Sequence, residues 1–349
     1  MRDVAIVSFA QSAKAREIRN EIEILMPVVQ EAVRNSKLPR QEIGFTCSGS
    51  SDYLQGQSFA FVGALDAVGA WPPIKESHVE MDGAWALYEA WIKIQTGDVD
   101  SALVYSFGKS SPGDLPEILA LQLDPYTMTP LWPDADSLAA LQARAFLEAT
   151  GKSERDLAQV VARSRRDAVG NPHAVVSGAV DVEKLLAEPH YRSPLRAHDL
   201  PPITDGASAM VVVAGERARK LCERPVWIRG FDHRIEPLGL GLRDLARSAS
   251  TEIAGQKAGV HKGKVDFAEL HAPYAHQELI LRAALGLGEN VTINPSGGAL
   301  ASHPLMVAGL IRIGEAATRI MARRGDRAVA HATQGPCLQQ NLVCVLEGD

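Results

Sequence analysis

The amino-acid sequence predicts an α/β fold in which a parallel sheet carries helices on its faces. Short apolar segments of strand length alternate with longer segments whose apolar residues recur at helical spacing. This alternation occupies the first hundred residues and returns after residue 225, which indicates two similarly built halves. With 46% hydrophobic and 22% charged residues, the 349-residue chain has an ordinary globular balance.

The first half predicts four strands with helices between them. The expected strands are residues 4–9, 43–47, 77–79 and 101–106, and the expected helices are residues 21–34, 58–68 and 82–95. Gly69 and Gly97 end the last two helices, as glycine commonly does. Because strands joined through a helix pair in parallel, this order predicts a βαβαβ arrangement.

The middle of the chain, residues 109–198, departs from this pattern. It contains several proline turns and two expected helices, 136–150 and 153–168, before a strand at 209–213 resumes the sheet. We interpret it as an insertion that caps the sheet, where substrate pockets are often built. The expected organisation is therefore a first half over residues 1–220, which includes this insertion, and a second half over 221–349.

The second half repeats the alternation of strands and helices. The expected strands are residues 226–231, 267–271, 291–293, 328–331 and 342–346, and the expected helices are 238–254, 277–287 and 304–322. The dinucleotide fingerprint of strand, GxGxxG and helix does not occur, since the glycine cluster at 237–241 lacks a suitable preceding strand.

Composition excludes several functional classes. The net charge is −6 and no basic block is large enough to indicate nucleic-acid binding. The four cysteines lack CxxC spacing, so neither a zinc site nor a disulfide framework is expected. The apolar segment after Asp3 is too short for a targeting sequence, and no apolar run reaches membrane-spanning length. We expect a soluble, cytoplasmic protein.

The stretch Asn294 to Gly309, which reads NPSGGALASHPLMVAG, carries the strongest functional signal. A strand leads into a glycine turn, and a short apolar run then brings His303 in front of Pro304. Glycines allow a left-handed backbone and close approach to a ligand, and proline is tolerated in the first turn of a helix. The pattern predicts His303 at the mouth of a helix, where the helix dipole stabilises a developing negative charge.

This stretch resembles the glycine-rich turn and GHP-type motif of the thiolase superfamily, with Ser302 in place of the glycine. Further segments resemble the sterol-carrier-type thiolases and extend the resemblance over nearly the whole chain. They are Asn171-Pro172, Pro194-Leu195-Arg196, Asp205-Gly206-Ala207-Ser208-Ala209, and Glu269-Leu270-His271 followed by Tyr274. Gln277 occupies the family's asparagine position. The resemblance implies the thiolase fold, with two βαβαβαββ halves layered as an α-β-α-β-α sandwich and an inserted loop domain.

One position departs from the family pattern. Thiolases carry a nucleophilic cysteine at the start of the buried helix that begins here near Asp82. Counting back from Thr96-Gly97-Asp98 places the position of that cysteine at about Glu80. No cysteine lies within thirty residues of Glu80, so an acyl-enzyme cannot form in the family's way. A carboxylate at a helix start is also a common stabilising cap, and we weigh that interpretation above catalysis for both Glu80 and Asp82. The family's second catalytic cysteine has no clear counterpart either.

The retained histidines, His271 and His303, imply chemistry on an acyl-CoA enolate without a covalent nucleophile. Retro-aldol cleavage of a β-hydroxyacyl thioester needs a base for the hydroxyl proton and donors for the enolate oxygen. We expect one histidine to be the base, and the other, with Gln277 or backbone amides, to polarise the thioester carbonyl. Glu80 and Tyr274 are further candidates, whereas His78, His276 and His331 are better explained as structural residues.

The resemblance also implies a substrate and partners. We expect Gly297, Gly298 and Ser302 to contact substrate, with no metal and no cofactor apart from the CoA of the substrate. The sub-family resembles steroid side-chain aldolases, which implies a homodimer or a dimer with a paralogue, beside a small zinc-binding OB-fold (DUF35) protein. Two alternatives stay open: a cysteine-free condensing enzyme, and a non-catalytic acyl-CoA or lipid-binding protein or inactive subunit of a complex.

Overall fold

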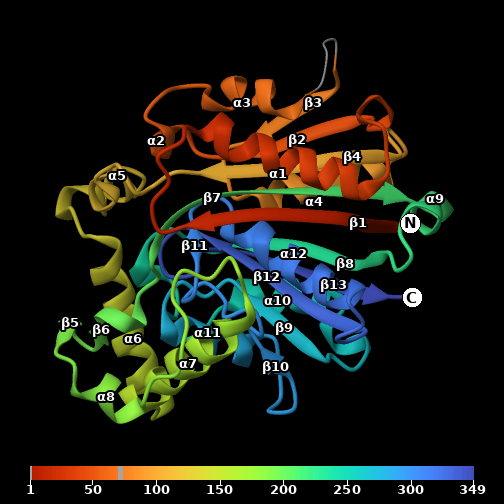
Figure 1. Ribbon diagram of the computed structural model, residues 1–349. Coiled ribbons are helices and arrows are strands. Elements are labelled where there is room, and N and C mark those ends of the chain that lie inside the picture. Colours follow the sequence, from red (N-terminus) through yellow and green to blue (C-terminus); the bar gives the residue numbers. More distant parts are fainter. Residues whose placement is uncertain (1, 70–73) are drawn as a thin grey trace.

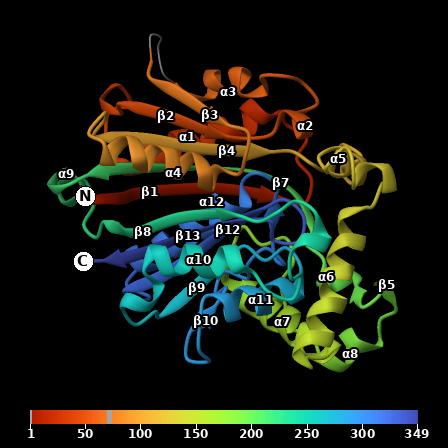
Figure 2. The ribbon, with the colours of Figure 1, turned by 180° about the vertical axis from the view of Figure 1, so that it is seen from behind.

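The protein is described by a computed structural model over residues 2–69 and 74–349. Two sheet-and-helix halves lie one above the other in Figure 1, and a helical cap covers one end of both. Each half contributes five main strands to a sheet of eleven, and helices lie on both faces of each half. The view from behind, Figure 2, shows the cap helices α6, α7 and α8 beside the second half.

The first half has the sheet order β3-β2-β4-β7-β1. Strands β2, β3 and β4 are parallel, and β7 runs antiparallel between β4 and β1. The strands are β1 (Val4–Lys14), β2 (Phe45–Gly49), β3 (Glu76–Val79), β4 (Ser101–Gly108) and β7 (Ile203–Ala214). The helices are α1 (Glu21–Ser36), α2 (Asp52–Gln55), α3 (Ala60–Val68), α4 (Gly83–Gln95) and α9 (Glu216–Leu221).

The second half repeats this arrangement, with the order β10-β9-β12-β13-β8. Its strands are β8 (Val226–Ile235), β9 (Phe267–Leu270), β10 (Thr292–Ile293), β12 (Arg327–Gln334) and β13 (Gln340–Gly348). Its helices are α10 (Ala249–Ala258), α11 (Ala275–Ala284) and α12 (Ala308–Met321). Counted along the chain, strands one to five take the same places in both orders, so the prediction of two similar halves is confirmed.

The two halves meet along a narrow seam. Strands β1 and β8 pair only at Ala5 with Trp227 and at Ile6 with Val226. Away from this seam, α4 and α12 pack together between the halves, and one apolar core contains residues of both helices and of strands from both halves of the sheet. Helices α1 and α3 cover the outer face of the first half, and α10 and α11 cover that of the second.

The cap connects β4 to β7. It consists of α5 (Leu115–Leu121), α6 (Ala135–Thr150), α7 (Glu154–Asp167), α8 (Val182–Ala187) and the small hairpin of β5 (His190–Arg192) and β6 (Leu195–Arg196). Helices α6 and α7 pack on α11, so the cap lies against the second half although the chain inserts it into the first.

Three expected helices were placed wrongly at their starts. The helix expected at 304–322 is α12, which begins at Ala308, because Pro304 belongs to a two-residue strand, β11 (His303–Pro304), paired with β7. The helix expected at 238–254 begins only at Ala249. The segment 58–68 forms the helix α3 only from Ala60, and a separate short helix, α2, precedes it. No helix among the described residues is long and apolar enough to cross a membrane.

Candidate active site

The two motif histidines lie in contact at the end of the molecule that the cap covers. The Nε2 atom of His271 is 2.9 Å from the Nε2 atom of His303, and the ring centroids are 5.0 Å apart. Both residues are buried, with 4% and 8% of their surfaces exposed. The structure therefore joins two residues that are 32 positions apart in the sequence.

His271 follows directly on strand β9, and its ring is held from the neighbouring strand β12. The backbone amide of Thr333 donates to Nδ1 of His271 at 3.2 Å, and the backbone amide of His271 donates to the carbonyl of His331. Because Nδ1 is an acceptor, the hydrogen-bond network assigns the ring proton of His271 to Nε2. That N–H group donates to Nε2 of His303, whose own proton is then on Nδ1.

His303 is held by strand pairing, and the prediction that it lies at the mouth of a helix is wrong. Strand β11 pairs with the start of β7, and the backbone amide of His303 donates to Oγ1 of Thr204 at 2.9 Å. Helix α12 begins five residues later, at Ala308. The proline that follows His303 therefore fixes a strand and turn in front of the helix.

Burial keeps both imidazoles neutral. It lowers the pKa of His303 to about 4, with the positive charge of Arg312 adding to the effect. The pKa of His271 lies well below its usual range because of burial and then of the neighbouring His303, His331 and Arg312. A neutral imidazole has one proton-accepting and one proton-donating nitrogen, so the pair offers one base and one hydrogen-bond donor.

A buried ion pair is formed by Arg312 on α12 and Glu269 on β9. Nη1 of Arg312 donates to Oε2 of Glu269 at 2.9 Å and to Oγ of Ser296 at 2.7 Å. Ser296 donates to Glu269 through its amide and its hydroxyl. This network connects the glycine turn to strand β9, which His271 follows, so it helps to fix the position of the histidine pair.

The glycine turn is packed against the cap. Gly297 and Gly298 have φ values of 95° and 68°, a backbone region that glycine adopts without strain. A Cβ atom on Gly297 would come within 2.6 Å of the Cβ atom of Ala168, so no side chain fits there. Ser302 is buried beside His303, and its hydroxyl has no hydrogen-bond partner among the described residues. Of these three expected substrate contacts, Ser302 alone has an unused polar group.

Gln277 and Tyr274 connect α11 to the cap helix α6. The amide nitrogen of Gln277 donates to Oε1 of Gln142 at 2.9 Å, and its oxygen accepts from the backbone amide of Tyr274. The Tyr274 hydroxyl donates to Asp136 at 2.8 Å. Burial, followed by the Asp136 charge, raises the pKa of Tyr274 well above its usual value. Both polar atoms of Gln277 are thus already engaged with protein groups.

Glu80 lies after strand β3, with 48% of its side chain exposed. Its Oε1 accepts from the backbone amide of Asp52, the first residue of α2, at 2.6 Å. Its Oε2 lies 3.4 Å from Nε2 of His78. Glu80 therefore caps a helix while keeping contact with solvent.

Asp82 is the N-cap of α4 and is almost fully buried. Its carboxylate accepts from the amide of Ala84 at 2.9 Å, and from the amides of Gly309 and Leu310 on α12 at 2.8 and 3.0 Å. Burial raises the pKa of Asp82, and the three amide hydrogen bonds act against that rise. The backbone amides at the starts of α4 and α12 therefore already donate hydrogen bonds to the Asp82 carboxylate.

The four cysteines do not form a reactive centre. Cys47, Cys337 and Cys344 are buried and Cys222 is partly buried, and all four are free thiols. Burial raises the pKa of each, that of Cys337 to about 12. A thiol with a raised pKa is a poor nucleophile at neutral pH because little of it is ionised.

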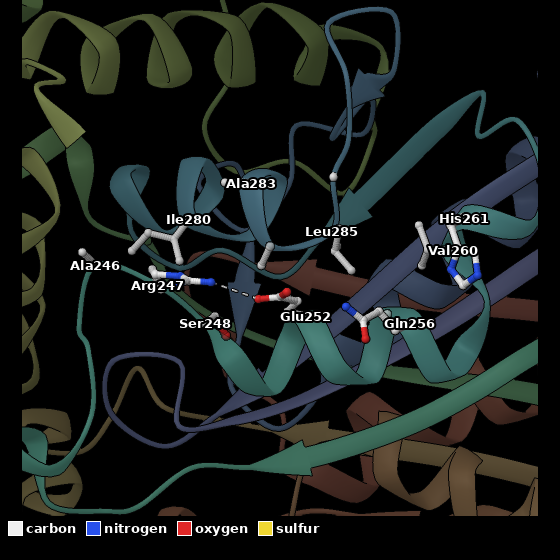
Figure 3. Close-up of a pocket in the computed structure, with 13 residues that line it drawn as sticks. Ala246, Arg247, Ser248, Glu252, Gln256, Val260, His261, Ile280, Ala283 and Leu285 are labelled. Atoms are coloured by element: carbon white, nitrogen blue, oxygen red, sulfur yellow. Dashed lines mark hydrogen bonds and ion pairs between the residues drawn. The ribbon is translucent and has the colours of Figure 1, made fainter. Parts of the chain in front are cut away.

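One cavity, lined by residues of α10 and α11, lies away from the histidines. It has a volume of about 400 Å³ and lies between α10 and α11, as Figure 3 shows. Ile280 and Leu285 form an apolar wall, and Arg247 and Glu252 form an ion pair across its rim. Within residues 2–69 and 74–349, no three His, Cys, Asp or Glu side chains are grouped to hold a metal ion.

Comparisons with known proteins agree with this architecture. The chain is 24% identical to human sterol carrier protein 2 over 90% of its length and 64% of that protein. It is 26% identical to benzoylsuccinyl-CoA thiolase subunit BbsB of Thauera aromatica over 58% of its length, and the match covers 60% of that protein. Acetyl-CoA acetyltransferase of Methanothermobacter thermautotrophicus is 27% identical over 57% of this chain, and the match covers 58% of that protein. No family model matches the chain.

Solved structures show the same fold. A structure described as an Ltp2-ChsH2(DUF35) aldolase superposes with a TM-score of 0.82, 18% identity and coverage of 99% of this chain and 98% of that chain. A monomeric SCP2-thiolase-like protein from Mycobacterium smegmatis superposes with a TM-score of 0.79 and 18% identity. The match covers 99% of this chain and 76% of that chain. The chain is therefore similar in sequence and in fold to members of the thiolase superfamily. The resemblance to sterol-carrier-type thiolases is confirmed, and neither the first turn of α4 nor the three residues before it contain a cysteine.

Proposed function

We propose that the protein is an acyl-CoA retro-aldolase that cleaves the Cα–Cβ bond of a β-hydroxyacyl-CoA without an acyl-enzyme. The observation that supports this most is the contact of two neutral imidazoles, His271 and His303, at 2.9 Å. They supply the base and the donor that this reaction needs. The thiolase-like relatives and the aldolase of the same fold support an enzyme acting on an acyl-CoA.

His303 is the base in this proposal. The amide of Thr333 occupies Nδ1 of His271, which leaves the accepting lone pair of the histidine pair on Nε2 of His303. A substrate hydroxyl takes the place of His271 as the hydrogen-bond donor to that atom. His303 then accepts the hydroxyl proton, the Cα–Cβ electron pair moves to the thioester as an enolate, and the former β-carbon leaves as a ketone or aldehyde. Protonation of the enolate carbon releases the shorter acyl-CoA.

His271 is the donor to the thioester oxygen. Its Nε2–H group is freed once the substrate separates the pair, and a neutral imidazole is an effective hydrogen-bond donor to a developing oxyanion. The other donors considered from the sequence are engaged, since Asp82 accepts from the amides at the starts of α4 and α12 and Gln142 accepts from Gln277. The assignment of the enolate oxygen to His271 follows from this occupancy.

The substrate side and the partner rest on the fold likeness. We propose a bulky, steroid-like group on the β-carbon and a zinc-binding OB-fold (DUF35) partner. The support is the aldolase of the same fold, whose description names DUF35. A homodimer, or a dimer with a paralogue, belongs to the same proposal.

The test is to mix the purified protein with a bulky tertiary 3-hydroxyacyl-CoA in the absence of free CoA. Release of a ketone and a shorter acyl-CoA, followed by chromatography and mass spectrometry, is the expected result. His303→Ala and His271→Ala lower kcat by about 10²–10⁴-fold, the usual contribution of a proton-transfer group. Cleavage that requires added free CoA contradicts the proposal, because thiolysis consumes CoA and retro-aldol cleavage does not.

A second candidate function is a non-catalytic acyl-CoA or lipid-binding subunit. It is favoured by the closed state of the site, in which the histidines bond each other and Asp82 fills the helix starts. Under this alternative, acyl-CoA binding measured by calorimetry stays unchanged in a His271→Ala/His303→Ala double variant, and no ketone is released. A cysteine-free condensing enzyme instead forms a longer acyl-CoA from two acyl-CoA molecules in the same assay.

A further inference from the structure

The hairpin between strands β12 and β13 has a strained tip. Gln334 and Gln340 are its last paired residues, so the tip consists of residues 335–339. Within it, Cys337 and Leu338 follow each other with φ values of 54° and 60°. This left-handed region is unfavourable for residues that carry a Cβ atom, and such residues keep it only where the surrounding structure holds them. Strain of this kind is concentrated near functional sites.

Arg243, in the segment between β8 and α10, holds the tip with both ends of its guanidinium group. Nη1 donates to the carbonyl oxygen of Cys337 and Nη2 to that of Pro336, each at 2.8 Å. Arginine presents its donors in a rigid planar fork, so two successive carbonyls fix the orientation of the peptide between them. The arginine is therefore placed to maintain the strained conformation.

Gln142 on the cap helix α6 holds the same tip from another side. It is fully buried, and its Nε2 atom donates to the carbonyl of Cys337 at 3.2 Å and to that of Leu245 at 3.3 Å. Its Oε1 atom accepts from His276 at 3.1 Å and from Gln277 at 2.9 Å. These four contacts use the two donors and two acceptor sites of a side-chain amide. Gln142 thus anchors both the tip and the segment that carries the arginine.

The strands at the base of this hairpin carry the contacts that orient His271. Thr333, which pairs with Asn341 across the hairpin, donates its amide to Nδ1 of His271 at 3.2 Å. Asn341 donates to the carbonyl of Leu338 in the tip at 2.7 Å and accepts from Nε2 of His331 at 3.0 Å. The carbonyl of His331 accepts from the backbone amide of His271. Ring and backbone of His271 are therefore both bonded to the hairpin whose tip is held.

We propose that Arg243 is a positioning residue for the histidine pair: by holding the strained tip, it keeps the Thr333 amide on Nδ1 of His271. This inference rests on the proposed function, in which the Nε2–H group of His271 donates to the thioester oxygen. Without Arg243 the tip relaxes, the end of β12 shifts, and Nδ1 of His271 loses its donor. The ring then adopts both neutral tautomers, and the one protonated on Nδ1 has no proton on Nε2 to offer the oxyanion.

The experiment replaces Arg243 by methionine, which removes both donors. Nitrogen NMR of protein labelled with ¹⁵N-histidine reports the tautomer of His271, with its signals assigned by comparison with His271→Ala. In the wild type, Nε2 is expected to be protonated and Nδ1 unprotonated, whereas Arg243→Met gives averaged signals of the two tautomers. The kcat for cleavage of the tertiary 3-hydroxyacyl-CoA falls by about 10²-fold, as a small misplacement of a reacting group does, with little change in KM.

The matched control is Arg247→Met. It makes the same change four positions along the chain, where the arginine side chain is 70% exposed and pairs with Glu252 on the surface (Figure 3). Tautomer, kcat and KM are expected to equal those of the wild type. Loss of kcat in this control as large as that in Arg243→Met overturns the assignment to the tip.

Relief of the strain distinguishes positioning from a general loss of stability. Glycine adopts the left-handed region without strain, so Cys337→Gly reduces the need for the arginine. The Arg243→Met/Cys337→Gly variant is expected to recover part of the lost kcat and the wild-type tautomer. Arg243→Lys, which offers a point charge in place of the fork, lies between Arg243→Met and the wild type. It gives the same comparison if Arg243→Met does not fold by circular dichroism. A merely structural role predicts a lower unfolding temperature with an unchanged tautomer.

The outcomes separate this inference from the proposed function. An unchanged His271 tautomer in the folded Arg243 variants overturns the positioning role, whether or not the wild type cleaves substrate. A raised KM at unchanged kcat also overturns it, because the arginine then contacts substrate. Wild-type protein that cleaves nothing refutes the retro-aldolase, and the tautomer alone then decides whether Arg243 orients His271.

Discussion

The carboxylate of Asp82 and the backbone amide of Gly309 are joined by a 2.8 Å hydrogen bond across 227 positions of the chain. Gly309 permits this contact because a Cβ atom there would lie 2.5 Å from Oδ1 of Asp82. The same carboxylate caps α4 and receives the amide of Leu310. One side chain therefore connects the two halves at the starts of their central helices.

Replacement of Asp82 by alanine is expected to destabilise the fold. Three buried amides lose their acceptor, and each buried donor left unpaired costs about 1–3 kcal/mol, so a loss of about 3 kcal/mol or more is expected. Asp82→Asn retains one acceptor oxygen, so its free energy of unfolding should lie between those of the wild type and Asp82→Ala. Urea unfolding measures the difference, with Asp66→Ala, at an exposed position on α3, as the control. Equal midpoints for Asp82→Ala and Asp66→Ala contradict this account.

The activity of the histidine pair is expected to persist in mild acid. His303 acts as a base only while neutral, and burial lowers its pKa to about 4 from the ordinary 6.5. The rate of cleavage should therefore change little between pH 7.5 and pH 5.5 and fall as the pH approaches 4. Circular dichroism at each pH confirms that the protein is folded. A loss of activity centred near pH 6.5 means that the reacting base is a solvated histidine elsewhere.

The free energy of unfolding, in contrast, is expected to decrease as the pH is lowered from 6.5 toward 4. Burial lowers the pKa values of His303 and His331 to about 4 and that of His276 to about 3. Below pH 6.5 the unfolded chain binds protons that the folded chain excludes, so stability is full above pH 6.5 and is lost as the pH falls toward 4. Urea midpoints across this range measure the slope. His276→Gln removes one titrating group and should flatten the slope, even if the variant is less stable at pH 7.5.

Strand β4 packs against the segment after His303 so closely that no side chain fits at Gly108. A Cβ atom on Gly108 would lie 2.0 Å from the carbonyl oxygen of Leu305. Gly108→Ala must therefore displace the segment that carries His303, and overpacking of this kind costs about 1–3 kcal/mol. Both the unfolding midpoint and kcat should decrease. Gly170→Ala is the control, since no atom lies within 4 Å of the added Cβ; similar behaviour of the two variants argues against a tight contact at Gly108.

The buried ion pair of Arg312 and Glu269 gives a test by double substitution. Removing one member leaves an uncompensated buried charge, so Arg312→Met should cost about 3–5 kcal/mol. Arg312→Met combined with Glu269→Gln should cost less than the sum of the two single changes, because neither charge is then left alone. Additive losses in chemical denaturation mean that the two side chains do not interact.

Thiol reagents are expected to leave activity intact. Cys47, Cys337 and Cys344 are buried, and burial raises the pKa of every one of these thiols and of Cys222. Iodoacetamide at pH 7.5 should therefore label the folded protein slowly, at Cys222 first, without loss of cleavage. Inactivation that a Cys222→Ser variant does not prevent reveals a cysteine in the chemistry.

The periodic parts of the fold were predictable from the sequence. The elements of both halves were expected near their observed positions because strand and helix periodicities are local properties of a chain. Errors occurred where tertiary pairing decides, as at Pro304, which joins β11 because β7 offers it a partner. A proline before a helical pattern does not reveal such a partner.

The candidate site was predictable only in part. Motif resemblance singled out His271 and His303, which the structure brings into contact. Thr333 and Thr204, which hold the two residues, carry no motif, and Thr333 acts through its backbone amide. Gln142 and Asp136, the cap partners of Gln277 and Tyr274, lie in a helix whose only sequence signal is its amphipathic pattern. These contacts join residues 62 to 138 positions apart, and such distant contacts leave no local pattern in the sequence.

The common strand order of the two halves bears on how such a molecule acquires new chemistry. Ser50 follows β2, and His271 follows the corresponding strand β9. A duplicated framework thus provides two equivalent places for a reactive side chain, and here only one of them holds an imidazole. Each place is supported by its own half of the sheet, so evolution or protein design can alter one while the other keeps its geometry.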